Sequence, residues 1–153
     1  MLALGSDDHN RAELYTFATG EWSATAAYPF RPEISWPGLV EMGGDFYSFG
    51  GLQRYGVDMY GDMMNEIARF SPRSNKWTQL GQLTVARKSA AVTIINNAFY
   101  IVGGGTERPS NWDKVTPTEK CTLVGTSGIE CVNISNTQAF LSPAAFAVPD
   151  DFC

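Results

Sequence analysis

Hydrophobic residues in this chain occur in short runs that are rich in aromatic and β-branched side chains and lie between turn-forming residues. Short runs bounded by glycine, proline, asparagine and serine predict β-strands rather than helices. The expected strands cover residues 2–5, 12–17, 21–24, 38–43, 45–50, 66–70, 76–80, 90–96, 98–103, 119–124 and 129–133. The pattern of apolar positions therefore predicts an all-β chain with tight turns.

Part of this pattern is repeated. The segment at residues 45–51, which ends in two glycines, returns 53 residues later at residues 98–104. The same spacing relates Glu13 to Glu66 and Glu66 to Glu119. The other landmarks of the repeat, all aromatic residues or glycines, are Phe17, Trp22, Gly50, Gly51, Phe70, Trp77, Gly103 and Gly104. Several landmarks that recur at one period predict consecutive copies of one structural unit.

A repeat of about 50 residues with a double glycine, an aromatic residue and a tryptophan resembles the kelch repeat. The resemblance covers roughly residues 2–135. It implies that each repeat is a four-stranded antiparallel blade of a β-propeller, with the tryptophan packed between neighbouring blades. The expected fold class is therefore all-β, a partial kelch β-propeller of about three blades. The expected units are a partial first blade without its inner strand at residues 1–30, a second blade at 31–83, a third at 84–136 and a carboxy-terminal tail at 137–153.

Such a propeller is incomplete. Propellers usually close with about four to eight blades, and a blade cannot bury both of its faces without neighbours. We therefore expect further blades or other chains to be needed for closure. This interpretation makes the chain the carboxy-terminal part of a longer propeller or an incomplete gene product, with assembly of several chains into one ring as the alternative. The apolar segment at residues 139–148 is a candidate for a closing strand.

Two of the three cysteines fall on neighbouring strands of the third expected blade. A hairpin whose turn centres on Thr126 places Cys121 directly opposite Cys131, and the Cα separation of about 4.5–5.5 Å at such positions matches disulfide geometry. Cys131 also stands where the other repeats have tryptophan, so we interpret the bridge as a replacement for that residue. The alternative is a pair of buried free thiols in a cytosolic protein.

A disulfide indicates an oxidising compartment. Asn133 begins an Asn-Ile-Ser triplet, which is a candidate glycosylation site. Together these features predict a secreted or extracellular glycoprotein, with the cytoplasm as the alternative location. Because the first residues are too few for a secretory signal, this prediction also expects a truncated amino terminus.

Charge and composition exclude several classes of function. The formal net charge of −5 offers no basic face to nucleic acid, and no run of about 18 apolar residues could span a membrane. The single histidine, His9, leaves little room for catalysis by a histidine base, and zinc and P-loop motifs are missing from the sequence. The related copper enzyme galactose oxidase uses two histidines, which this chain lacks. The sequence therefore predicts neither catalysis nor a cofactor or metal ion.

Binding residues are expected on the long connections between the second and third strands of each blade, at residues 6–11, 52–65 and 105–118. Strand alternation places these loops on one face with the connections between blades, and long loops on a rigid scaffold commonly carry function. The candidate binding residues there are Arg31, Arg54, Tyr55, Tyr60, Arg87, Lys88, Arg108 and Trp112. Such residue types are enriched in interfaces, and the arginines favour an acidic peptide partner. The alternative is that the methionines and aromatic residues fold back and cap the core.

The sequence thus predicts a non-catalytic protein-binding module of the kelch type, located outside the cell, with a protein partner of unknown identity. An intracellular kelch adaptor, which presents substrates to a ubiquitin ligase or binds actin, is the first alternative. A fragment of an enzyme like galactose oxidase is the second. The state of the cysteine pair separates the first two hypotheses, and the number of histidines separates the third from both.

Overall fold

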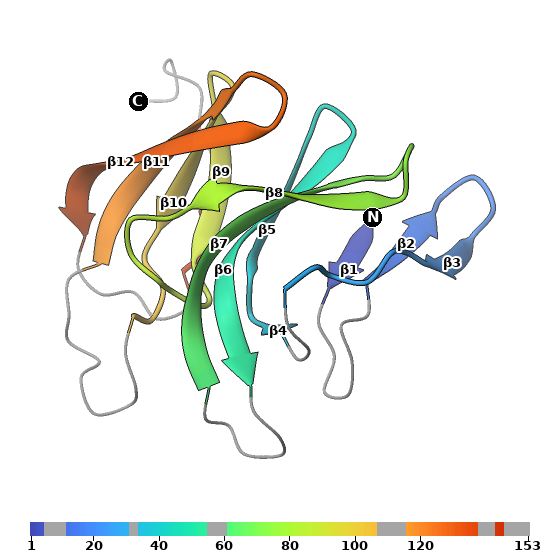
Figure 1. Ribbon diagram of the computed structural model, residues 1–153, viewed down its shortest axis with the longest axis horizontal. Helices are drawn as coiled ribbons and strands as arrows, with labels where there is room; N and C mark the ends of the chain where they lie inside the picture. The colour runs from blue at the N-terminus through green and yellow to red at the C-terminus, as the bar shows by residue number, and fades with distance from the viewer. Residues whose placement is uncertain (5–11, 31–33, 55–60, 107–115, 138–142, 146–153) are drawn as a thin grey trace.

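The computed structural model describes residues 1–4, 12–30, 34–54, 61–106, 116–137 and 143–145. Regular structure in these residues consists of β-strands, which form three antiparallel sheets in the order of the chain (Figure 1). Within the same residues, no helix has the length and hydrophobicity needed to cross a membrane. The prediction of an all-β fold is therefore confirmed.

Each sheet corresponds to one expected blade. The first holds β1 (Leu2–Leu4), β2 (Ala12–Thr16) and β3 (Glu21–Ala24). The second holds β4 (Ile34–Ser35), β5 (Gly38–Met42), β6 (Asp45–Arg54), β7 (Gly61–Ser71) and β8 (Lys76–Gln82). The third holds β9 (Ala91–Ile95), β10 (Ala98–Val102), β11 (Thr116–Val124) and β12 (Gly128–Thr137).

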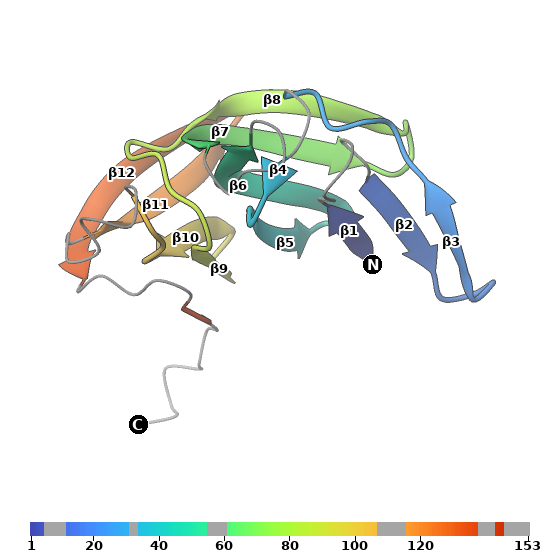
Figure 2. The same ribbon diagram turned by 90° about the horizontal axis from the view of Figure 1, so that it is seen from below.

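The three sheets are stacked along an arc (Figure 2). Strands β5 and β9 lie on its concave side and β8 on its convex side. The concave strands of neighbouring sheets approach closely, because a Cβ atom added to Gly38 would lie 2.6 Å from Cγ2 of Val92. This arrangement of inner and outer strands is that of consecutive propeller blades.

Most observed strands lie close to the predicted ones, but β4 was not predicted and β12 continues past the predicted end at residue 133. The largest correction is in the second sheet. We expected a strand to end at the double glycine and a loop to cover residues 52–65. Instead β6 passes through a bulge between Phe49 and Gly51 and pairs with β7 as far as Arg54 and Gly61. The extension is stable because Leu52, near its end, is buried. In the third sheet the strand does end before Gly103, as predicted.

A hydrophobic cluster fills each junction between sheets. The junction between the second and third sheets contains Tyr47, Phe49, Ile67, Leu80, Leu83, Phe99, Ile101, Cys121 and Ile129. The junction between the first and second sheets contains Ala12, Tyr28, Ile34, Met64, Ala68, Phe70 and Trp77. Each sheet therefore buries one face against the next, which is the packing expected of stacked repeats.

The repeat tryptophans differ in their surroundings. Trp77 is 6% exposed, packs edge-to-face on Tyr28 with ring centroids 4.8 Å apart, and donates its indole N–H to the carbonyl of Ala26 at 3.1 Å. Trp22 is 48% exposed. Trp77 therefore packs between the first and second sheets, whereas Trp22 lies on the face of the first sheet that points away from the second.

The double glycines allow backbone segments from two sheets to meet. Gly50 has a φ of +59°, and a Cβ there would collide with the carbonyl oxygen of Arg87. The amide of Gly51 donates to that same oxygen at 2.8 Å. At Gly104, a Cβ would lie 2.6 Å from the carbonyl oxygen of Lys88. Both repeats have glycine at these positions because a side chain would push the neighbouring connection away.

Candidate functional site

The ends of β6 and β10 and the starts of β7 and β11 lie on one side of the molecule, the lower side in Figure 1. Strand β4 pairs with the end of β6, and the backbone of Lys88 forms a bridge with Gly105 just after β10. The connections between sheets therefore share a face with these strand ends, as strand alternation predicted. We call it the long-loop face and define it by residues 34–36, 52–54, 61–63, 87–89 and 105.

A tryptophan and a lysine meet on the long-loop face. Trp36 is 43% exposed, and the ammonium nitrogen of Lys88 lies 4.6 Å from the centroid of its ring. The amide of Ser89 donates to the carbonyl of Trp36 at 2.8 Å, so the two segments are held together by their backbones. A cation over an indole ring at this distance is an attractive contact that also leaves part of the ring open to a partner.

The same two residues stand next to the inner strands. Trp36 precedes β5 by two residues, and Lys88 precedes β9 by three. Burial lowers the pKa of Lys88 from its usual value. A carboxylate from a partner would counter that effect by favouring the charged ammonium. The pair therefore offers an aromatic surface and a cation at the concave side of the arc.

Sequence reasoning found Lys88 and missed Trp36. A signal was available, since Trp36 does not fall on the repeat register that Trp22 and Trp77 share. A tryptophan outside the repeat has no packing role assigned by the repeat. Trp112 also falls outside the repeat register. The sequence analysis named it as a candidate binding residue, and it lies outside the described residues.

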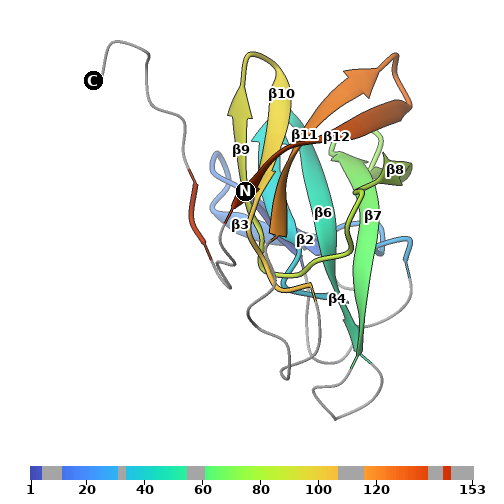
Figure 3. The same cartoon turned by 90° about the vertical axis from the view of Figure 1, so that its left-hand side faces the viewer.

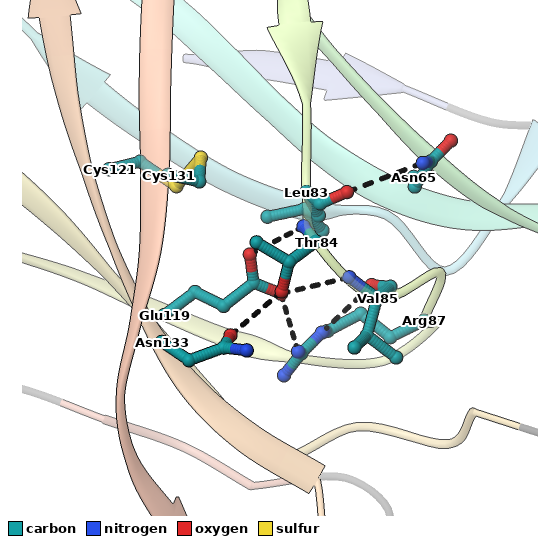
Figure 4. Close-up of a disulfide and its surroundings, with 9 residues drawn as sticks. All are labelled: Asn65, Leu83, Thr84, Val85, Arg87, Glu119, Cys121, Cys131 and Asn133. Carbon is teal, nitrogen blue, oxygen red and sulfur yellow. Dashed lines mark hydrogen bonds and ion pairs between the residues drawn. A yellow bond between two sulfur atoms is a disulfide. The ribbon is translucent and has the colours of Figure 1, made fainter.

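Arg87 requires a correction. We expected it on the binding surface, but its side chain is 0% exposed and lies at the junction of the second and third sheets (Figure 4). Its Nη2 donates to Oε1 of Glu119 at 2.6 Å, and its Nη1 donates to the carbonyls of Gly103 at 3.1 Å and Pro117 at 2.7 Å. Burial lowers the pKa of Arg87, and the Glu119 carboxylate opposes this change. The guanidinium therefore stabilises the junction between the two sheets and is buried away from any binding partner.

Glu119 completes this buried site. Its carboxylate accepts the amide of Thr84 at 2.7 Å and the amide of Val85 at 3.3 Å (Figure 4). The two amides belong to the connection that leads from β8 to β9, while Glu119 belongs to β11. The carboxylate thus anchors the connection between sheets to the third sheet. This contact gives the glutamate at this repeat position a structural role in the third sheet.

The disulfide is present between Cys121 and Cys131, as the hairpin register predicted. The two residues are directly opposite in β11 and β12, with Cα atoms 4.1 Å apart. Cys121 is fully buried in the cluster between the second and third sheets, and Cys131 packs against that cluster. Cys131 thus faces the preceding sheet, as Trp77 does in the second sheet, which agrees with its interpretation as a replacement for tryptophan.

Donor atoms of Glu119, Cys121 and Cys131 lie within 4.8 Å of one another. The two sulfur atoms are already joined in the disulfide, and the carboxylate binds Arg87 and two backbone amides. Metal coordination by cysteine requires free thiolates. We therefore interpret this group as structural.

The remaining candidates are only partly visible. Residues His9, Arg31, Tyr55, Tyr60, Arg108 and Trp112 lie outside the described residues. Arg54 ends β6, and its side chain also lies outside them. Met64 is buried in the cluster between the first and second sheets. At that position the structure agrees with the alternative that methionines on these connections cap the core.

Asn133 is exposed on β12. Its Oδ1 accepts a hydrogen bond from the hydroxyl of Thr84 at 2.7 Å. A glycan would be attached through Nδ2, so this hydrogen bond is compatible with the predicted modification.

Comparison with known proteins agrees with the repeat. The chain is 29% identical over 98 residues to the zebrafish (Danio rerio) Kelch repeat and BTB domain-containing protein 12, covering 62% of this chain and 15% of that protein. It is 27% identical over 85 residues to N-acetylneuraminate epimerase of Shigella sonnei, covering 56% of this chain and 23% of the enzyme. It is 26% identical over 98 residues to the Arabidopsis thaliana F-box/kelch-repeat protein At4g39560, covering 63% of this chain and 35% of that protein. No family model matches the chain.

Among solved structures, the chain is similar to the β-propeller YjhT, with a TM-score of 0.63 and 18% identity. The likeness covers 88% of this chain and 47% of YjhT. The fold, the repeat and these similarities define the chain as a partial kelch-type β-propeller. It spans 15% to 35% of the length of the curated relatives described above.

Proposed function

We propose that the chain is a non-catalytic protein-interaction module whose long-loop face binds an acidic peptide segment. The observation that carries the proposal is the Trp36–Lys88 pair, with its partly exposed indole and its lysine at 4.6 Å. Tryptophan is enriched among the residues that dominate binding energy, and a nearby cation recognises carboxylates. Kelch-repeat relatives support a protein partner.

The geometry favours an extended peptide over a compact small molecule. The pair lies where two connections between sheets meet, beside the paired ends of β6 and β7. A peptide could cross this edge while its apolar side chains contact the indole and a carboxylate approaches Lys88. The arginines at positions 31, 54 and 108 are proposed to extend the positive charge along the same face.

Selection of a random phage-displayed peptide library on the immobilised chain tests this proposal. We expect enrichment of Asp and Glu among the selected peptides and weaker binding of those peptides to Trp36→Ser and Lys88→Glu variants. Lys76→Glu is the matched control, because Lys76 is exposed at the start of β8 on the opposite side of the sheet. Peptides without acidic residues, or equal binding by the Lys88→Glu and Lys76→Glu variants, would contradict it.

We further propose that the protein functions outside the cytosol and carries a glycan on Asn133. The Cys121–Cys131 disulfide and the exposed sequon support this location. Non-reducing mass spectrometry of protein from its native source should detect the linked peptides and the glycan. Free thiols and an unmodified Asn133 would favour the intracellular adaptor instead.

A second candidate function is suggested by the similarity to N-acetylneuraminate epimerase. In that case the long-loop face would bind an acidic sugar, whose carboxylate would pair with Lys88 while the sugar ring contacts Trp36. Proton NMR of N-acetylneuraminate with and without the chain tests this function. Faster interconversion of the epimers in the presence of the chain would favour an enzyme over the interaction module.

A further inference from the structure

Trp36 has an unusual backbone conformation for a residue of its size. Its φ is +53°, in the left-handed region that glycine adopts freely and bulky residues rarely adopt. Ser89, at the same repeat position 53 residues later, also has a φ of +53°. Each of the two residues precedes the inner strand of its sheet by two positions. Because tryptophan and serine adopt the same conformation here, the fold rather than the side chain imposes it.

The pairing of the second sheet shows how this conformation is imposed. Strand β4, which ends just before Trp36, pairs with β6 beyond its bulge, at Leu52. Strand β5, which begins two residues after Trp36, pairs with β6 on the other side of that bulge, at Phe49. The crossing lies on the long-loop side of the sheet, where β4 adjoins the end of β6 (Figure 3). The carbonyl of Trp36 also accepts the amide of Ser89 at 2.8 Å, so its backbone is held in place from two sheets.

Complete burial of the ring does not offset the strain at Trp36. The repeat tryptophan of the second sheet, Trp77, is 6% exposed, whereas Trp36 is 43% exposed. Glycine would adopt the same left-handed conformation without strain. Strained residues that persist in a fold are concentrated at functional sites, where the strain holds a side chain in its working position. The conformation of Trp36 therefore indicates that its ring serves to bind a ligand.

The cation beside the ring has no carboxylate partner within the described part of the chain. Ion pairs between described residues involve Arg69 and Arg87 but not Lys88. The ammonium of Lys88 lies instead 4.6 Å from the centroid of the Trp36 ring. A carboxylate from a ligand can therefore pair with Lys88 without replacing a carboxylate of the described residues.

The distance between the two groups defines the spacing that a ligand needs. An ammonium group binds a carboxylate oxygen at about 2.7–2.9 Å. Since Nζ of Lys88 lies 4.6 Å from the ring centroid of Trp36, a bound carboxylate and a group that contacts the ring lie within about 7 Å of each other. Side chains on one face of an extended chain are two residues apart, which also corresponds to about 7 Å. An acidic and an apolar side chain two positions apart therefore match Lys88 and Trp36.

We propose that Trp36 is the specificity-determining residue of the long-loop face and selects extended peptides in which a large apolar residue lies two positions from an acidic one. This inference rests on the proposed function and names the class of peptide that the site accepts. Lys88 binds the carboxylate, and the indole ring contacts the apolar side chain. The left-handed turn keeps the ring at the surface, where a peptide reaches it.

Selection of a random phage-displayed peptide library on the immobilised chain tests the spacing, once the selected sequences are aligned on their acidic residues. We expect enrichment of large apolar residues two positions from the acidic residue and not at the adjacent position. Trp36→Gly and Trp36→Ala should bind the selected peptides at least about tenfold more weakly, because both lack the ring. Trp36→Phe, which keeps a flat ring, should bind more tightly than either variant.

Stability separates a binding role of the ring from a packing role. We expect Trp36→Gly to unfold at a higher urea concentration than Trp36→Ala, because glycine relieves the strain of the positive φ. The two variants should nevertheless lose peptide binding equally. Asn97→Gly and Asn97→Ala are the matched controls, since Asn97 also has a positive φ and lies in the exposed turn between β9 and β10. They should show the same order of stability with unchanged peptide binding.

Three results would overturn the inference without refuting the proposed function. These are acidic peptides that lack an apolar residue at this spacing, a Trp36→Gly variant no more stable than Trp36→Ala, and peptide binding that follows the stability of these two variants. Selected peptides without acidic residues would refute the proposed function itself, and the inference with it.

Discussion

The guanidinium of Arg87 donates to the carboxylate of Glu119 at 2.6 Å, and both side chains are completely buried at the junction of two sheets. Arg87 belongs to the connection before β9 and Glu119 to β11, so the pair joins segments that are 32 residues apart. A buried ion pair whose remaining groups are hydrogen-bonded holds such segments in one arrangement.

Removing one partner of this pair should be costly. We expect Arg87→Met to lower the free energy of unfolding by about 3–5 kcal/mol, because Glu119 would be left as an unpaired buried charge. The double variant Arg87→Met with Glu119→Leu should recover part of the loss. Chemical denaturation followed by fluorescence measures both values. Arg69→Met is the control, since its contact with Asp45 is longer and partly exposed, and it should cost less than about 1 kcal/mol. Equal losses for Arg87→Met and Arg69→Met would contradict the structural role.

The close approach at the double glycine makes a second prediction. Gly50→Ala should lower stability by about 2–4 kcal/mol, because alanine combines a disfavoured positive φ with a collision against the Arg87 carbonyl. Gly43→Ala provides a matched comparison, since Gly43 also has a positive φ but a Cβ atom added there would meet open space. That variant should lose only about 1 kcal/mol. Thermal unfolding of both variants would show no difference if backbone conformation alone required glycine at Gly50.

The disulfide should contribute measurably to stability. Its closed loop has a sequence separation of 10, for which chain entropy predicts about 2–3 kcal/mol. Urea titrations of the oxidised chain and of Cys121→Ala with Cys131→Val should differ by that amount. A Cys153→Ser variant controls for the loss of a thiol elsewhere. Coincident titration curves for the oxidised chain and the double variant would show that the bridge is not a major source of stability.

Stability should also depend on pH above the neutral range. Burial raises the pKa of Tyr28 above its usual value of 10.0, and a hydrogen bond with Ser48 partly opposes this shift. Because the folded pKa is the higher one, the stabilisation is complete below about pH 10 and is lost as the pH rises toward the folded pKa.

We therefore expect the free energy of unfolding to fall above pH 10 and to fall less steeply in Tyr28→Phe. Tyr15→Phe serves as the control for removal of a tyrosine hydroxyl elsewhere. Urea midpoints measured between about pH 9 and pH 11 would test the slope. Parallel slopes for the unmodified chain and Tyr28→Phe would contradict the assignment to Tyr28.

Short-range sequence signals determined most of the fold. Alternating apolar residues and turn formers located the strands to within a few residues, because each pattern reflects local backbone geometry and burial of one strand face. The period of 53 residues identified the blades. The symmetric hairpin around Thr126 placed Cys121 opposite Cys131, since register in a tight hairpin follows from its turn. The short strand β4, the end of β12 and the extension of β6 past Gly51 were not predicted. The pairing of the β6 extension depends on the burial of Leu52 and Met64 against other segments.

Tertiary structure decided which individual polar and aromatic side chains are buried and which residues they contact. Arg87 and Lys88 are adjacent in sequence, yet one is buried against Glu119 and the other lies over Trp36 on the surface. Trp22 and Trp77 occupy the same repeat position, yet only Trp77 is covered by a preceding sheet. Sequence patterns predict where a strand forms and which of its faces is buried. Which partner that face meets depends on segments distant along the chain, and those are brought together only by the stacking of the sheets.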